Sequence, residues 1–146
     1  MEQRIQIDET EPLAYKAMFG LEAYLKQGKL SKLHYELIKI RASQLNGCAF
    51  CINMHTQEAL KMGEEPKKLF LLDAWWDTEL FSEEEKVILK ITEEVTMIHD
   101  QGLTRETYSK AMERFDASYI SQIIMAIVTI NAWNRIAIST QKPLVY

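Results

Sequence analysis

Glycine and proline are scarce in this chain, with only five glycines and three prolines in 146 residues. Because these two residues mark most turns, their scarcity leaves few breaks between regular segments. No stretch alternates strictly between apolar and polar residues, and no valine-rich run lies between turn signals, so the usual marks of strands are missing. The sequence therefore predicts an all-α protein and argues against a sheet.

The chain also lacks an excess of positive charge. It has 17 basic and 21 acidic residues, a net charge of -4, and no run of five basic residues, which argues against a general nucleic-acid or anionic-membrane binder. Residues 1–4 contain no apolar signal-peptide core. The most apolar stretch, residues 119–138, carries several polar side chains and an arginine, so it is a poor membrane span. We expect a cytoplasmic protein with neither nucleic acid nor membrane as a partner.

Cysteine is equally rare, and the only two cysteines lie three positions apart at Cys48 and Cys51. His55 follows four residues after the second. A chain of this length can bury a core as one domain without a disulfide or a metal, and stable structural disulfides are rare in the cytoplasm. We therefore expect this pair to be catalytic, redox-sensing or metal-binding.

Apolar periodicity and capping residues predict a single-domain bundle of six to seven helices. They are expected at about residues 12–27, 31–46, 48–63, 66–76, from 82 to just before Gly102, 104–115 and 117–139. The inner stripe of the first is expected to be Ala14, Ala17, Met18, Leu21 and Leu25, and that of the fifth Ile88, Ile91, Val95 and Ile98. The last helix is apolar over most of its circumference, which predicts the bundle core or a subunit interface.

The cysteine pair and the histidine are spaced to share one helix face. If a helix begins at or just before Cys48, then Cys51 and His55 lie three and seven residues on, close to one and two full turns. A thiolate near a helix N-terminus is favoured by the unpaired backbone N–H groups, which gives the lowest pKa to Cys48. The imidazole can exchange a proton with a thiol, and a second cysteine can convert a sulfenic acid to a disulfide.

Glu36 is the second unusual residue, because it lies within the apolar stripe of its predicted helix. Glutamate is seldom buried without a partner. The tight turn at Asn46-Gly47 predicts that this helix packs antiparallel to the next, which would bring Glu36 roughly opposite His55. A carboxylate that orients an imidazole, which in turn meets a thiol, has the logic of a proton relay.

These residues resemble the active-site signature of alkyl hydroperoxidase D (AhpD) and its relatives in the carboxymuconolactone decarboxylase-like superfamily. Residues 43–51 read SQLNGCAFC and resemble a stretch common in that group, and residues 131–135 (NAWNR) resemble a motif near its C-terminal end. The likeness extends to the size of the chain and its helical pattern. It implies a bundle of the AhpD type and a thiol-dependent peroxidase or thiol-disulfide oxidoreductase in antioxidant defence.

The resemblance also implies roles. Cys51 would attack, Cys48 would resolve, and Glu36 with His55 would relay protons, whereas the helix N-terminus favours Cys48 as the reactive thiol, so both assignments stay open. Phe50 stands where the best-known members have a histidine, which predicts a slower relay or a different substrate. The implied partners are a small hydroperoxide or a partner protein's disulfide, an external dithiol reductant and further copies of the chain, in a hexamer rather than a trimer.

Other readings compete with the redox one. The cysteines could be plain buried apolar residues, or Cys48, Cys51, His55 and Glu36 could hold zinc, although structural zinc sites usually add a second Cys/His pair. A non-redox member of the superfamily, with ligand binding or lactone decarboxylase-type chemistry, and a helical assembly module are further alternatives. No nucleotide fingerprint occurs, so no cofactor is expected. Arg135 in the last helix is expected to pair with a carboxylate.

Overall fold

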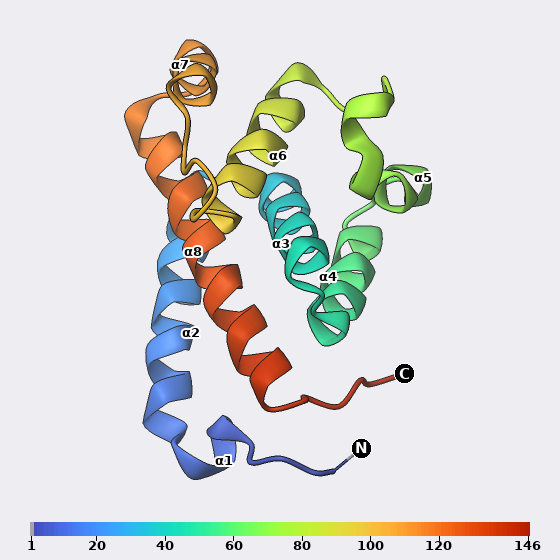
Figure 1. The fold of residues 1–146 in the computed structure, drawn as a ribbon, viewed down its shortest axis with the longest axis vertical. Helices are drawn as coiled ribbons and strands as arrows, with labels where there is room; N and C mark the ends of the chain where they lie inside the picture. Colours follow the sequence, from blue (N-terminus) through green and yellow to red (C-terminus); the bar gives the residue numbers. More distant parts are fainter. Residues whose placement is uncertain (1) are drawn as a thin grey trace.

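The computed structural model describes residues 2–146, and all of the regular secondary structure within them is helical (Figure 1). The elements are α1 (Ile7–Thr10), α2 (Pro12–Gln27), α3 (Lys32–Asn46), α4 (Ala49–Lys61), α5 (Pro66–Phe70), the 3-10 helix η1 (Leu72–Asp77), α6 (Glu83–Thr96), α7 (Arg105–Arg114) and α8 (Ala117–Ser139). The all-α prediction is confirmed. No described helix is both long and apolar enough to cross a membrane.

The helices of the described chain outnumber the predicted six to seven for two reasons. The single turn α1 buries none of its residues, so no apolar stripe could mark it in the sequence. The predicted helix over residues 66–76 is two elements, because α5 ends at Phe70 and the chain continues as a 3-10 helix. The helix that begins at the Ser82 capping box ends at Thr96, earlier than predicted, and Ile98 is therefore an exposed residue outside the helix.

Helix α3 lies at the centre of the bundle, where it packs against α4, α6 and α8 (Figure 1). Nine consecutive residues of α3, from Tyr35 to Ser43, are buried. Its two main faces join two apolar clusters: Ile38 packs with residues of α2, α6 and α8, and Leu37 and Ile40 pack with α4, η1 and α6. Full burial of such side chains contributes about 1.5–3 kcal/mol each. Any charged side chain in this segment must therefore find its partner inside the protein.

The predicted inner stripe of helix α2 is confirmed in part. Ala14 and Ala17 are exposed, whereas Tyr15 and Glu22 are partly buried and Leu25 is buried. Met18 and Leu21 are also partly buried, so three of the five predicted residues lie on the inner face. Only the two alanines were wrong, because the larger Tyr15 packs against the neighbouring α8 in their place. Tyr15 lies edge-on to Trp133 of α8, with ring centroids 5.2 Å apart.

Helix α8 runs through the core, as its apolar circumference predicts. Its buried residues include Ile120, Ile123, Ile127 and Ile130. The predicted salt bridge of Arg135 is wrong, because this side chain is exposed and donates hydrogen bonds to the backbone oxygen and Oδ1 of Asn131, each at 3.1 Å. On an exposed helix face water solvates the guanidinium, so the charge needs no carboxylate partner.

Candidate active site

A tight turn connects α3 to α4 and sets the position of Cys48. Gly47 has a left-handed backbone (φ 73°), which glycine adopts without the steric cost of a side chain. The Cys48 N–H donates to the Ser43 carbonyl at 2.9 Å and so satisfies an end group of α3. The side chain of Asn46 donates to Oδ1 of Asn131 and of Asn134, both at 2.9 Å, and thereby ties the turn to α8.

Asn134 completes this attachment from a fully buried position. Its Nδ2 donates to the Ser43 Oγ at 2.9 Å while its Oδ1 accepts from Asn46. The NAWNR segment at residues 131–135, noted above only as a motif, therefore has a structural task. Its two asparagines hold the end of α3 and the start of α4 in one geometry.

Cys48 and Cys51 form a disulfide with their Cα atoms 5.3 Å apart. Cys48 is the N-cap residue of α4, so the helix begins one residue later than Cys48, and the Cys48 Sγ accepts from the Cys51 N–H at 3.3 Å. Both residues are buried, and they pack against Ala137 of α8 and against Phe50. The two sulfur atoms point inward, as the helical spacing predicts, and the N-terminus of α4 lies next to Cys48.

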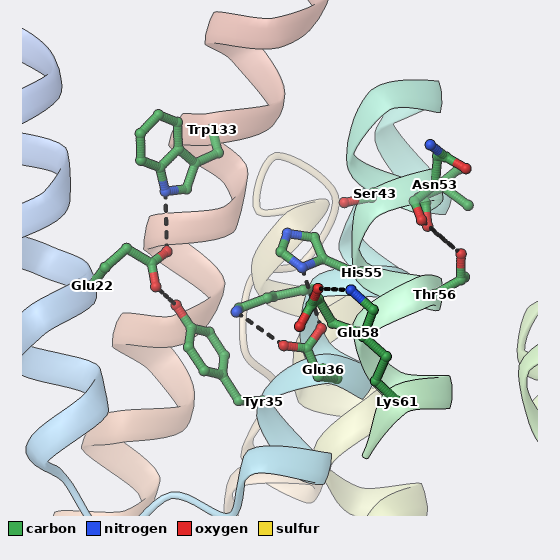
Figure 2. Close-up of polar contacts among 12 residues, drawn as sticks. Glu22, Tyr35, Glu36, Ser43, Asn53, His55, Thr56, Glu58, Lys61 and Trp133 are labelled. Atoms are coloured by element: carbon green, nitrogen blue, oxygen red, sulfur yellow. Dashed lines mark hydrogen bonds and ion pairs between the residues drawn. The ribbon is translucent and has the colours of Figure 1, made fainter. Parts of the chain in front are cut away.

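His55 follows Cys51 by one turn of α4 and faces Glu36 on α3 (Figure 2). Its Nδ1 lies 3.2 Å from the Glu36 Oε2, a distance that suits an ion pair once the imidazole is protonated, and the contact does not have the geometry of a hydrogen bond. Both residues are buried. Because Nδ1 faces the carboxylate, Nε2 is the ring nitrogen that remains for exchange of a proton with another group.

Lys39 is the third charged residue of this cluster and was not predicted to belong to it. Its Nζ lies 3.2 Å from the Glu36 Oε1 and 3.6 Å from the centre of the Tyr35 ring. Burial alone would raise the pKa of Glu36, but the contact with His55 and the ammonium of Lys39 outweigh it and hold that pKa below its ordinary value of 4.5. Glu36 is therefore a carboxylate held between Lys39 and His55.

A second carboxylate, that of a partly buried glutamate of α2, borders this cluster (Figure 2). Glu22 of α2 accepts from the Tyr35 hydroxyl at 2.8 Å and from the Trp133 indole N–H at 3.1 Å. Burial and the negative charge of Glu22 raise the pKa of Tyr35 well above its usual range. Tyr35 thus stays a neutral hydrogen-bond donor, and its ring face is available to the ammonium of Lys39.

A cavity of about 380 Å³ opens beside the disulfide. Cys51 and His55 line it, together with residues of α2, α3, α8 and the C-terminal segment. The remaining lining residues are Tyr15, Phe19, Glu22, Lys26, Lys39, Phe50, Met54, Trp133, Ile136, Ala137 and Lys142. The cavity thus gives a small molecule access to one sulfur of the pair and to the imidazole.

The site combines residues that the sequence singled out with others that it did not. The structure brings Cys48, Cys51, His55 and Glu36 together, and it places Phe50 on the cavity wall. Lys39 could have been noticed as a lysine within the same buried segment as Glu36, whereas the cavity aromatics carry no local signal. Over the described residues, no group of three or more histidines, cysteines and carboxylates is arranged to hold a metal ion.

Comparison with known proteins identifies the family. The sequence model of the Carboxymuconolactone decarboxylase family matches residues 12–94. The uncharacterized protein YdfG of Bacillus subtilis (strain 168) is 41% identical over 139 residues, which cover 95% of each chain. The chain therefore belongs to the carboxymuconolactone decarboxylase family.

Solved structures relate the fold to the AhpD branch. A protein of unknown function from Agrobacterium tumefaciens, ATU0492, whose name points to antioxidant defence of the AhpD kind, is 32% identical with a TM-score of 0.96, and the match covers 99% of each chain. The debrominase Bmp8 shares the fold at 16% identity and a TM-score of 0.82, over 94% of this chain and 74% of its own. The same fold thus occurs in proteins with different names, so the fold alone does not identify the reaction.

Proposed function

We propose that this protein is a thiol-dependent peroxidase that cycles between a dithiol and the Cys48–Cys51 disulfide. The observation that carries the proposal is the position of Cys51, which lines the cavity together with His55 while it is bonded to Cys48. The AhpD-type name of the Agrobacterium relative supports the same activity. The debrominase name belongs to a protein related by fold alone, and nothing in this site favours that reaction.

The first chemical step is the reduction of a hydroperoxide by Cys51. The thiol gives its proton to Nε2 of His55, and the resulting thiolate sulfur attacks the terminal oxygen of the peroxide. The O–O bond breaks, an S–O bond forms, and the alkoxide takes the proton back from His55. Cys51 is then a sulfenic acid, oxidised by two electrons, and the peroxide has become an alcohol. Glu36 orients the imidazole and balances its positive charge.

Cys48 completes the reaction by attack on the sulfenic acid. Its sulfur bonds to the Cys51 sulfur, the hydroxyl leaves as water with the Cys48 proton, and the disulfide forms. An external dithiol then attacks the Cys51 sulfur from the cavity, and Cys48 leaves as a thiolate. The Cys51 N–H, which reaches the Cys48 Sγ at 3.3 Å, and the N-terminus of α4 favour that leaving group. The dithiol is oxidised as the pair is reduced.

This scheme uses both arguments about the two cysteines. The helix N-terminus stabilises Cys48 as a thiolate, which suits a leaving group, while access to the cavity suits Cys51 as the attacking residue. A partner protein's disulfide is the alternative oxidant in the same cycle. The cytoplasmic location and the homo-oligomer, with a hexamer preferred to a trimer, remain predictions.

Thiol titration of the reduced protein tests the proposal. One equivalent of an organic hydroperoxide should remove two thiols per chain, and a dithiol such as dihydrolipoamide should restore both. Cys51→Ser should abolish the reaction. Cys48→Ser should still consume one equivalent of peroxide and leave a sulfenic acid that dimedone traps.

Three other results would change the proposal. Thiols that stay reduced, or that react only as fast as free cysteine, would favour the non-redox alternative of ligand binding or lactone decarboxylase-type chemistry. Trapping of a sulfenic acid in Cys51→Ser in place of Cys48→Ser would exchange the roles of the two cysteines. A pair that resists peroxide but exchanges rapidly with protein disulfides would leave a thiol-disulfide oxidoreductase as the function.

A further inference from the structure

The cavity beside Cys51 has an unusual distribution of charge. The protein as a whole is acidic, with a net charge of -4, yet the cavity lining contains three lysines and one glutamate. That glutamate, Glu22, already accepts from Tyr35 and Trp133, so its charge faces two protein donors. Lys39 and Lys142 pair with Glu36 and Asp8, which lie outside the lining. The attraction for an anion therefore comes from the ammonium groups on the cavity wall and not from a net positive charge.

Lys39 is the best placed of the three lysines because it is 9% exposed and fixed on α3. An ammonium has three N–H groups. The carboxylate of Glu36 takes one of them, and the face of the Tyr35 ring occupies a second direction. The ammonium keeps donor capacity toward the cavity, and a charged hydrogen bond formed at such a buried group is stronger than one in bulk water.

The rest of the cavity suits an apolar body. Tyr15 and Phe19 of α2 and Trp133 of α8 form an aromatic group with ring centroids 5.2 to 6.0 Å apart. Phe50 and Met54 of α4 contribute further apolar wall. A volume of about 380 Å³ falls within the usual range for small-molecule sites.

From this arrangement we infer that the cavity binds amphipathic carboxylates, with the apolar, ring-sized body among Tyr15, Phe19 and Trp133 and the carboxylate on Lys39. The inference rests on the proposed function for its chemistry, since it makes the preferred oxidant an organic hydroperoxide that also carries a carboxylate. Binding itself requires no redox step. The selectivity can therefore be measured on the oxidised protein, in which the disulfide excludes peroxide chemistry.

The test uses 4-phenylbutyrate and its neutral counterpart 4-phenylbutanamide, titrated into the oxidised protein. Binding can be followed by tryptophan fluorescence, because Trp133 lies in the cavity wall, and Trp133→Phe should remove most of the signal. A charge-assisted hydrogen bond predicts that the carboxylate binds about tenfold tighter than the amide. Lys39→Met should abolish that preference and leave the affinity for the amide nearly unchanged.

Lys61→Met is the matched control, because Lys61 is an exposed lysine of α4 that pairs with Glu58 and does not line the cavity. It should keep the tenfold preference. Equal affinity of the wild-type protein for the two ligands would overturn the inference even if Lys39→Met failed to fold, and so would a preference that survives Lys39→Met. Failure of peroxide to oxidise the thiols would refute the proposed function alone, because the binding measurement does not depend on it.

Discussion

Replacement of Glu36 by glutamine is the most direct test of the charge cluster behind the disulfide. The substitution keeps the size of the side chain but removes the negative charge that lies 3.2 Å from both Lys39 and His55. Lys39 then remains buried without a counterion. Loss of one partner from a buried ion pair costs about 3–5 kcal/mol, and we expect the lower figure of about 3 kcal/mol because glutamine still offers an oxygen to the ammonium.

Urea denaturation of the oxidised protein measures this loss. With a slope of about 2 kcal/mol per molar, Glu36→Gln should lower the midpoint by about 1.5 M. The double variant Glu36→Gln with Lys39→Met should be more stable than Glu36→Gln alone, because it removes the unpaired buried charge. A loss below about 1 kcal/mol in the single variant, or no recovery in the double one, would refute the charge argument.

The pH dependence of the free energy of unfolding is a second test of the Glu36 charge. The pKa of Glu36 lies below its ordinary value of 4.5 in the folded protein, because His55 and Lys39 outweigh the effect of burial. A carboxyl group with a depressed pKa stabilises the fold fully above its unfolded pKa, and this contribution is lost as the pH falls through the folded pKa. The stability difference between wild type and Glu36→Gln should therefore be largest near neutral pH and shrink below 4.5. A difference that stays constant across this range would contradict the assignment.

Three further predictions follow from the turn and from the helices. Gly47→Ala should lower the free energy of unfolding by about 1 kcal/mol, because alanine is strained at φ 73°, and urea denaturation would detect it. Asn134→Ala should lower the free energy of unfolding by about 2 kcal/mol, because Ser43 and Asn46 each lose a hydrogen bond. It should also slow the formation of the disulfide by peroxide, and an unchanged rate would show that the turn does not depend on Asn134. Light scattering should give a mass that is a multiple of 17.0 kDa, and a monomeric mass would exclude the predicted homo-oligomer.

The fold was largely predictable because its signals are local. Scarce glycine and proline, the Ser82–Glu85 capping box and apolar periodicity depend only on neighbouring residues, and the capping box is present as predicted. The short helix α1 was not predicted, because its four residues bury no side chain and therefore show no apolar periodicity. The exposed alanines of α2 show the same limit, since the rotation of a helix depends on its neighbour and not on its own sequence.

The shared helix face of Cys48, Cys51 and His55 could be inferred from the sequence, because helical spacing places them there. The sequence also indicated a buried role for Glu36, because the charge interrupts an apolar stripe. The packed helices, in contrast, were needed to show that Cys51 and His55 line a cavity and that Lys39 supplies a cation there. They were also needed to show that Glu22 joins Tyr35 to Trp133. These contacts join residues of α2, α3, α4 and α8, and their geometry follows from how whole helices pack, which no local spacing encodes.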